Sequence, residues 1–466
     1  MAHFHKNTKV DIPSRAERLR LQNISAWVSR CTRQGVIGKI YQRILIYVVL
    51  RSLLAHGIIT ALIRADPPIG EPRFIRYITR DAYHNGATGT ATFSTEEASA
   101  AALAEALERS IWRNDTDYFE QPVCASIVSM QDLEYTAPER FVGISPVRRN
   151  TDALLRLPHD ATYTWIRAES LTKGSNAVYV PAQIVSKAYN RAPDEPIIRY
   201  PSTTGLATAP RRDQALLRGA LEIIERDAFM ITWLNQITPP RVNTDHLVGE
   251  NTKLGSLIAS CRESRLRIDI VRLITNAPAY ALAAIVRSER DADIIRFSIG
   301  MAAHRNASAA AEKALREALH MRLSTIARVH RAPEISSIER SNIKNWERLL
   351  YWNTERRYER LAPLAEGPLQ PLRTEAWDAD SEHDHLRRIV QWCSDCGYEC
   401  CSVSLTHAKK NLTPWAIEFV LIPEMQPMHL NESRQYVDGA RLTDVPRSLG
   451  YAPRASPYME EPHPFA

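Results

Sequence analysis

Hydrophobic positions along the chain follow two periods, and together these periods predict a mixed α+β fold. Helical spacing recurs near residues 95–112, 211–236, 307–325 and 383–396. The alternation typical of strands occurs near residues 162–168, 177–184, 400–406 and 414–422. No low-complexity linker separates these segments. We therefore expect one large domain over residues 26–466, preceded by a basic N-terminal tail over residues 1–25.

One short motif occurs twice within this pattern. A Glu-X-X-Glu-Arg sequence begins at Glu105 and recurs 117 residues later at Glu222. In both copies a Thr- and Ala-rich turn that contains Gly precedes the helix. The repeat predicts two related α/β halves, at about 26–150 and 151–350, with a C-terminal part over 351–466.

The repeated motif carries the candidate chemistry. Its glutamates are three residues apart, so both carboxylates of each copy project from one side of a helix. A solvent-exposed Glu–Arg pair would explain a single copy, but the flanking residues of both copies are apolar and indicate partial burial. Neighbouring buried carboxylates repel one another unless cations compensate them, and Mg²⁺ commonly bridges carboxylates to nucleotide phosphates. The motif therefore favours a site for Mg²⁺ and ATP, although no P-loop or Rossmann fingerprint is present.

Longer segments of the chain resemble the YcaO family. In family order they are Tyr163–Leu171, Val180–Ala182, Ser202–Ala209, Ala215–Ala228, Ala314–Arg322 and Ile422–Met428. The resemblance covers about residues 85–466 and is faint before them, where Thr32–Ile37 is similar to the family's opening nucleotide-contact segment. It implies the YcaO fold, in which ATP and Mg²⁺ lie between the glutamate-bearing helices of two related halves.

The resemblance also implies individual binding residues. The implied metal ligands are Glu105, Glu108, Glu222 and Glu225. The implied ATP contacts are Arg109, Ser202, Thr204, Gln214, Arg226, Glu317 and Arg322. The chain departs from the family pattern at Ala101, Pro210, Gln214 and His320, where Ser, Asn, Glu and Gln are usual. Some ATP contacts must therefore be replaced, whereas the metal-binding glutamates are all present.

The sequence ends in Glu461-Pro-His-Pro-Phe-Ala466, which is similar to the proline-rich ending of azoline-forming YcaO proteins. In that group the tail reaches into the active site. The similarity implies catalytic roles for Pro462, His463, Pro464 and Ala466, with His463 or the terminal carboxylate as the proton acceptor. The family usually ends in Pro instead of Ala. The alternative is a frayed terminus without a catalytic role.

The activity that the resemblance implies is ATP-dependent cyclodehydration of a ribosomally made precursor peptide. A Cys, Ser or Thr side chain attacks the preceding carbonyl, ATP phosphorylates the resulting oxyanion, and loss of phosphate leaves a thiazoline or oxazoline ring. Thioamide formation with external sulfide is the rival within the same fold. A catalytically silent nucleotide-binding scaffold is the rival from another class.

The family match uses nearly the whole chain, so the sequence predicts partner subunits. We expect an E1-like subunit that binds the precursor leader, and a dimer of this chain within a hetero-oligomer. An FMN-dependent dehydrogenase in the same complex would oxidise azolines to azoles.

The net charge is +6, and the excess of positive charge lies in the first 65 residues. A solvated helix face is the simpler interpretation of this basic segment, and nucleic acid is disfavoured because aromatic residues do not interleave with the charges. Arg51 and His56 interrupt the apolar stretch Ile44–Ile63, which predicts a buried helix instead of a membrane span. No secretory signal is evident, so a cytoplasmic location is expected.

Four cysteines gather near residue 400, and a shared zinc ion is one interpretation of their spacing. They are Cys393, Cys396, Cys400 and Cys401. However, strand alternation places Cys400 and Cys401 on opposite faces of a sheet. Small buried side chains are therefore the favoured interpretation.

Overall fold

The computed structural model describes residues 37–83, 85–114, 116, 119, 121–331, 343–406, 412–454, 459 and 461–465. The predicted basic tail and Ala466 lie outside these residues.

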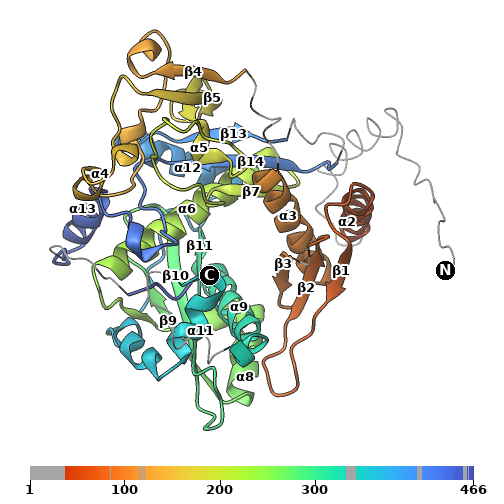
Figure 1. Ribbon diagram of the computed structural model, residues 1–466. Helices are drawn as coiled ribbons and strands as arrows, with labels where there is room; N and C mark the ends of the chain where they lie inside the picture. Colours follow the sequence, from red (N-terminus) through yellow and green to blue (C-terminus); the bar gives the residue numbers. More distant parts are fainter. Residues whose placement is uncertain are drawn as a thin grey trace.

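Three sheets form the framework of the described chain (Figure 1). The first has the order β1 (Ala61–Arg64), β2 (Ile75–Arg80), β3 (Thr88–Ala91). The second has the order β4 (Val123–Ser126), β5 (Thr162–Ser170), β13 (Cys401–Ser404), β14 (Ala416–Leu421), β7 (Leu206–Ala209), and β6 (Ala177–Pro181) also pairs with β5. The third has the order β11 (Phe297–His304), β10 (Tyr280–Ser288), β9 (Leu266–Arg272), β8 (Arg241–Val242), β12 (Leu369–Gln370). The described strand pairs are antiparallel except β8 with β12.

Four long helices and several short ones pack against these sheets. The long helices are α2 (Ile37–Ala55), α3 (Thr95–Asn114), α6 (Arg212–Leu234) and α9 (Ala307–Ile326). The others are α4 (Pro146–Arg149), α5 (Ala182–Val185), α7 (Asp245–Glu250), α8 (Thr252–Glu263), α11 (Arg348–Asn353), α12 (Glu382–Asp395) and α13 (Arg441–Ser448). The α+β class and the predicted helices at α3, α6, α9 and α12 are confirmed, as are the predicted strands at β5, β6, β13 and β14.

The central architecture is a strand–turn–helix unit that occurs three times. In each unit a strand leads through a short turn into a long helix that packs on it: β3 into α3, β7 into α6, and β11 into α9. Each helix also contacts the strand of the next unit, so that α3 meets β7, α6 meets β11 and α9 meets β3. The motif that the sequence shows twice therefore belongs to two of three units. The third unit, β11 with α9, lacks the Glu-X-X-Glu-Arg sequence.

Glycines at the strands allow these helices to approach closely. A Cβ atom at Gly89 of β3 would lie 1.9 Å from the Ala98 carbonyl oxygen of α3. A Cβ atom at Gly300 of β11 would lie 2.2 Å from the Ala318 nitrogen of α9. Contacts this short exclude any side chain, so the helix backbones rest directly on the strands. This proximity brings polar groups at the helix surface within reach of strand amides.

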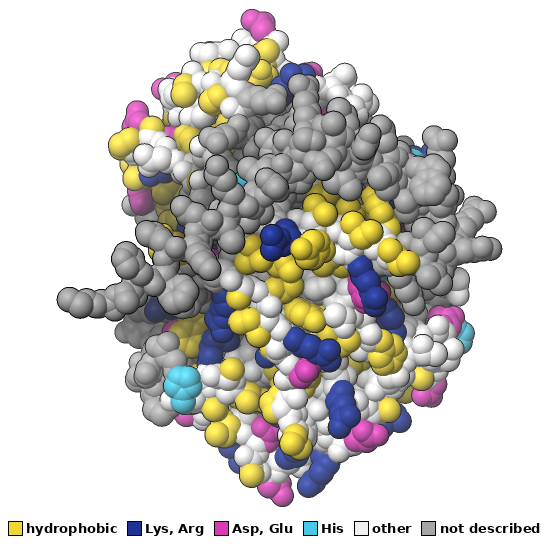
Figure 2. Space-filling model, turned by 90° about the vertical axis from the view of Figure 1, so that its right-hand side faces the viewer, with side chains coloured by type: hydrophobic (Ala, Val, Ile, Leu, Met, Phe, Trp, Pro, Cys, Tyr) yellow, Lys and Arg dark blue, Asp and Glu magenta, His cyan; other side chains and the backbone are white. Residues whose placement is uncertain are grey.

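Helix α2 begins and ends earlier than the sequence predicted, and it is more exposed. The predicted helix over 44–63 is confirmed up to Ala55, but the residues after it turn into β1, so its last part is wrong. Val49 and Leu53 are buried, but Ile40, Ile44 and Tyr47 are about half exposed. Figure 2 views the side on which α2 and β1 lie and shows hydrophobic side chains interspersed with Lys and Arg. Within the described residues, no helix has the length and apolarity that crossing a membrane requires.

The clustered cysteines divide between two cores. Cys393 and Cys400 are buried among side chains of α6 and α12, whereas Cys401 is buried among residues of β5, β14 and α3. The predicted separation of Cys400 and Cys401 to opposite sides of the sheet is therefore confirmed. Cys396, by contrast, is exposed.

Candidate active site

Five glutamates from the three repeated helices form the centre of the candidate site. Glu105 and Glu108 lie on α3, Glu222 and Glu225 on α6, and Glu317 on α9. Their carboxylates repel one another across the helices. The charge of Glu222 raises the pKa of Glu108, and the charges of Glu105 and Glu222 raise the pKa of Glu317. The cyclic packing of the three units thus brings together residues that are up to 212 positions apart.

Backbone amides of the strands hold these carboxylates in place. The Thr88 amide donates to Glu105 (2.7 Å), and the Gly205 amide donates to Glu222 (3.1 Å). Both donors precede their glutamate by 17 residues, so the repeat in sequence is also a repeat in hydrogen bonding. Gly300 likewise precedes Glu317 by 17 residues.

The second glutamate of each motif reaches the neighbouring unit. Glu108 of α3 accepts a hydrogen bond from the Thr208 amide of β7 (2.6 Å). Glu225 of α6 accepts one from the Ala303 amide of β11 (3.3 Å). In the third unit the corresponding residue is His320, so only two of the three helices carry the pair. The two glutamates of each motif therefore bind backbone amides of their own unit and of the next unit.

Burial and mutual repulsion raise the pKa values of four of these glutamates, Glu108, Glu222, Glu225 and Glu317. Burial, with repulsion from Glu105 and Glu222, raises the pKa of Glu108 to about 8. Burial, with the charges of Glu222 and Glu105, raises the pKa of Glu317 to about 7. Burial also raises the pKa of Glu222 and, together with Glu317 and Glu222, raises the pKa of Glu225 well above its ordinary value. Carboxylates placed so close together are stabilised by a cation.

Two arginines compensate part of this negative charge. Arg109 forms an ion pair with Glu105. Arg226 lies 3.6 Å from a Glu222 oxygen and 3.7 Å from a Glu225 oxygen. Five carboxylates still outnumber two guanidinium groups, and Glu105 and Glu222 remain about 30% exposed, so an ion could reach them.

These carboxylates suit a Mg²⁺ ion that is bound together with a nucleotide. In the described part of the chain, no three His, Cys, Asp or Glu residues are arranged to bind one ion by themselves. Mg²⁺ usually takes only one or two protein carboxylates and completes its shell with water and substrate phosphates. Carboxylates on facing helices, with open space for phosphate oxygens between them, match that requirement.

A group of cations beside the glutamates was missed by the sequence analysis. It consists of Arg218 on α6 with Lys313 and Arg316 on α9. Desolvation, together with repulsion from Arg218 and Arg316, lowers the pKa of Lys313 to about 8, although Lys313 is an exposed residue and Glu312, which pairs with Arg316 (3.1 Å), acts in the opposite direction. Glu225 acts on Lys313 in the opposite direction, which places this group next to the glutamates. Mutually repelling cations beside a carboxylate site are suited to binding phosphate. Because these residues belong to no repeated motif, their proximity could not be read from spacing.

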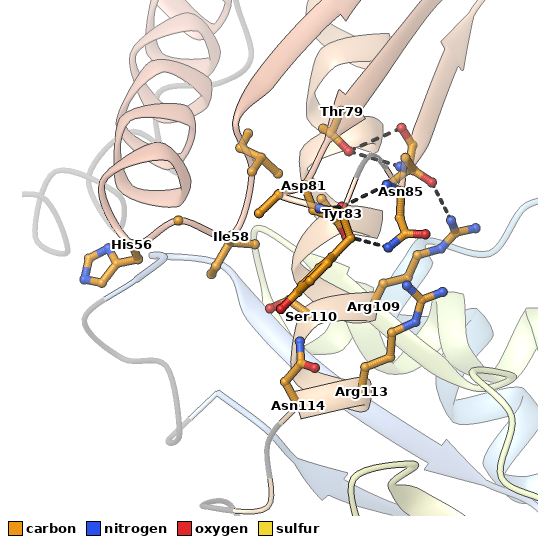
Figure 3. Close-up of a pocket in the computed structure, with 16 residues that line it drawn as sticks. His56, Ile58, Thr79, Asp81, Tyr83, Asn85, Arg109, Ser110, Arg113 and Asn114 are labelled. Atoms are coloured by element: carbon orange, nitrogen blue, oxygen red, sulfur yellow. Dashed lines mark hydrogen bonds between the residues drawn. The ribbon is translucent and has the colours of Figure 1, made fainter. Parts of the chain in front are cut away.

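A pocket of about 350 Å³ lies on the side of α3 that carries Arg109 (Figure 3). It lies between the α2–β1 turn, the β2–β3 hairpin and the C-terminal half of α3. Arg109 lines the pocket, donates to the Gly86 carbonyl oxygen (2.6 Å) and pairs with Glu105. One side chain thus joins the pocket to the carboxylate group.

The remaining predicted ATP contacts fall into two classes. Ser202 and Thr204 lie half-buried in the loop before β7, next to the Gly205 amide that binds Glu222. Gln214 instead donates to Glu382 of α12 (2.8 Å). Arg322 is nearly fully buried and pairs with Glu71 (2.7 Å) and Asp293. Its guanidinium therefore binds carboxylates outside the group of five glutamates.

The C-terminal segment is buried, contrary to a frayed terminus. Pro462, His463, Pro464 and Phe465 are all buried, and Phe465 packs edge-on against Phe229 of α6 at 4.5 Å between ring centroids. Burial, with Arg348, His429 and Arg226, lowers the pKa of His463 well below its ordinary value. Because Arg226 also contacts Glu222 and Glu225, the segment lies close to the glutamate group. His463 is therefore a neutral imidazole near the candidate site.

The family model described as YcaO cyclodehydratase, ATP- and Mg²⁺-binding, matches residues 90–426. The chain belongs to the YcaO family. The matched region contains all five glutamates, and the family binds ATP and Mg²⁺. A curated relative, an uncharacterised protein of Methanothermobacter thermautotrophicus, is 27% identical over 201 residues, which cover 42% of this chain and 50% of that protein. The YcaO chain thus matches about half the length of that relative.

Solved structures share the fold at low sequence identity. A heterocyclase in complex with substrate and cofactor has a TM-score of 0.71 at 19% identity, covering 90% of this chain and 57% of that one. YcaO from Methanopyrus kandleri bound with AMPPCP and Mg²⁺ has a TM-score of 0.60 at 18% identity, covering 85% and 94%. The E. coli microcin synthetase McbBCD complex with pro-MccB17 bound has a TM-score of 0.60 at 14% identity, covering 87% and 96%. At these identities the likeness shows the fold alone.

The raised carboxyl pKa values predict how pH and Mg²⁺ affect stability. Between about pH 4.5 and 8 the folded protein holds protons on Glu108 and Glu317 that the unfolded chain has lost. Stability of the metal-free protein should therefore fall as pH rises through this window, and Mg²⁺ at pH 8 should restore it. Thermal unfolding with EDTA or Mg²⁺ at pH 6 and 8.5 measures both effects. Glu108→Gln should flatten the pH dependence, and an unchanged slope in this variant would contradict the assignment.

Proposed function

We propose that the chain is the ATP-using subunit of a peptide cyclodehydratase that converts Cys, Ser or Thr residues into azolines. The observation that carries the proposal is the meeting of five glutamates with the Arg218, Lys313 and Arg316 group, beside a buried tail that contributes a neutral His463. Carboxylates, phosphate-binding cations and a proton acceptor are the groups that phosphoryl transfer to an amide oxygen requires.

Each group has a distinct role in the proposed reaction. Mg-ATP, when bound, supplies the phosphoryl group that turns the amide oxygen into a leaving group. Glu105, Glu108, Glu222 and Glu225 would hold the metal ions. The cations would orient the phosphates, with Ser202 and Thr204 at the loop beside Glu222. His463 would accept the proton of the attacking side chain, because burial keeps its imidazole unprotonated.

The substrate and partners are part of the same proposal. A precursor peptide is the substrate, and an E1-like subunit would bind its leader. A flavin-dependent dehydrogenase would act on the azoline product. Support comes from the fold shared with a heterocyclase and with a synthetase complex that contains a precursor.

Mass spectrometry tests the reaction directly. The chain, its partner subunit, the precursor peptide and Mg-ATP should together yield peptide lighter by one water per modified residue. Thioamide formation would instead exchange oxygen for sulfur when sulfide is added. ATP binding without any change in peptide mass would favour the scaffold alternative. No mass loss with all components present would overturn the proposal.

Lys313→Gln is expected to weaken ATP binding by about tenfold to a hundredfold, because a charged hydrogen bond to phosphate contributes about 1.5–3 kcal/mol. Calorimetric titration of ATP with Mg²⁺ measures the change. Since the pKa of Lys313 is about 8, affinity for ATP should also fall as pH rises from 7 to 9.5 in the native protein. Lys253→Gln is the matched control, because Lys253 is also reached by solvent but pairs with Glu97 (3.2 Å) and is not among the charges that shift the pKa values of the site glutamates. Equal losses in both variants would exclude a specific role.

A further inference from the structure

The buried C-terminal segment is held by one face of a short helix. Arg348, Tyr351 and Trp352 of α11 stand at positions i, i+3 and i+4, so they project from the same side. Each donates a hydrogen bond to the C-terminal segment. Three consecutive residues of that segment receive these bonds, namely Glu461, Pro462 and His463.

Two of the bonds are made to backbone carbonyl groups deep inside the protein. The Trp352 indole nitrogen donates to the Pro462 carbonyl oxygen at 2.8 Å. An Arg348 nitrogen donates to the His463 carbonyl oxygen at 3.3 Å. Both donor side chains are fully buried. Because bonds to carbonyl oxygens fix the path of the chain independently of its side chains, α11 determines where this segment runs.

Arg348 is itself fixed by a buried carboxylate. Its guanidinium forms a two-point pair with Glu432, at 2.5 and 3.0 Å. The nitrogen that donates to one Glu432 oxygen also donates to the His463 carbonyl oxygen, so the planar guanidinium held by Glu432 fixes the direction of this second bond. The outer end of the segment is fixed as well, because Arg360 pairs with Glu461 at 2.7 Å.

The same arrangement sets the state of the His463 ring. Its Nε2 lies 2.6 Å from the His429 carbonyl oxygen, and a carbonyl can only accept, so this nitrogen carries the hydrogen. The Nδ1 atom is consequently an unprotonated acceptor, and it has no hydrogen-bond partner among the described residues. The lone pair of Nδ1 is therefore available to accept a proton.

The end of the C-terminal segment contacts α6 one helical turn after Glu225. Phe465 packs against Phe229, which follows Glu225 by four residues on α6 and therefore faces the same side. A shift of the segment along α11 would move His463 relative to Glu225 and Arg226.

We propose that α11 and Glu432 form a receptor for the C-terminal tail, in which Arg348 and Trp352 are positioning residues that act through the backbone of Pro462 and His463. The tail-receptor contact is a property of the fold, whereas its consequence for turnover rests on the proposed function. Two readouts on the full chain keep these parts separate.

The first readout is release of C-terminal residues by carboxypeptidase, followed by intact mass. Trp352→Phe keeps the ring and removes the donor, so the tail should open more often and release should quicken by about tenfold. Trp415→Phe is the matched control, since the Trp415 indole nitrogen is buried without a partner. Tyr351→Phe, which removes a bond of 3.2 Å to Glu461 at the outer end, should have a smaller effect in the same direction. Unchanged release in both Trp352→Phe and Tyr351→Phe would overturn the receptor.

The second readout is steady-state kinetics with precursor peptide. Trp352→Phe should lower kcat by about tenfold or more while KM for ATP stays within about twofold, because the variant displaces the tail and not the nucleotide site. Faster tail release with unchanged kcat would overturn the positioning role. If the native protein shows no turnover, the proposed function fails, but the carboxypeptidase result still decides whether α11 holds the tail.

Discussion

Glu222→Gln is expected to abolish turnover while leaving the fold intact. Glu222 accepts a hydrogen bond from the Gly205 amide at 3.1 Å, and an amide oxygen can replace the carboxylate in that bond. It cannot replace the charge that a metal ion requires. The loss should be at least about 10³-fold in kcat/KM, or about 4 kcal/mol of transition-state stabilisation. Glu108→Gln should behave in the same way, because its bond to the Thr208 amide is equally compatible with Gln.

The stability of the metal-free variants provides an independent check. Removing one of several repelling carboxylates should leave the melting temperature at pH 8 unchanged or higher, and should weaken the stabilisation by Mg²⁺. Glu399→Gln is the matched control, since Glu399 is buried but binds Ser170 and Thr172 in another part of the protein. Turnover retained in both Glu222→Gln and Glu108→Gln would refute the metal assignment.

The parts of the site that were predictable from sequence are those that depend on local spacing. Glutamates three residues apart on an amphipathic helix face the same way in any fold, so the pairs of α3 and α6 could be recognised before the structure was known. The repeat between them indicated that the two helices have equivalent positions. The equal distance of 17 residues from Thr88 to Glu105 and from Gly205 to Glu222 is the structural basis of that repeat.

The helix of the third unit and Glu317 were predicted, but the unit was not recognised as a repeat because its helix changes the motif. Glu317 occupies the place of the first glutamate, but His320 replaces the second and Met321 stands where the motif has Arg. The strand–turn–helix order and the distance of 17 residues from Gly300 to Glu317 are the signals that could have revealed it. Such a signal is weak in one sequence because it consists of spacing and a single carboxylate.

Arg322 illustrates what sequence spacing cannot provide. Its ion-pair partner Glu71 is 251 residues away, and Asp293 belongs to another loop. Only the closure of the third unit on the first brings these charges together. Arg218 and Lys313 were missed for the same reason, because 95 residues separate them in the chain.

Removing Pro462–Ala466 is expected to slow cyclisation by about 10²–10⁴-fold, the usual contribution of a positioned proton acceptor, while changing the affinity for ATP by less than about threefold. The deletion also exposes the Phe229 face of α6, so the melting temperature should fall.

His463→Ala separates the loss of rate from the loss of stability, because Phe465 and the carbonyl bonds to Arg348 and Trp352 remain. This variant should lose most of the rate and little of the stability. Single-turnover kinetics and calorimetric ATP titration measure the rate and the affinity separately. If the deletion lowered both by the same factor, the tail would serve the structure of the nucleotide site. A rate loss confined to chemistry would instead identify the tail as the proton acceptor for ring closure.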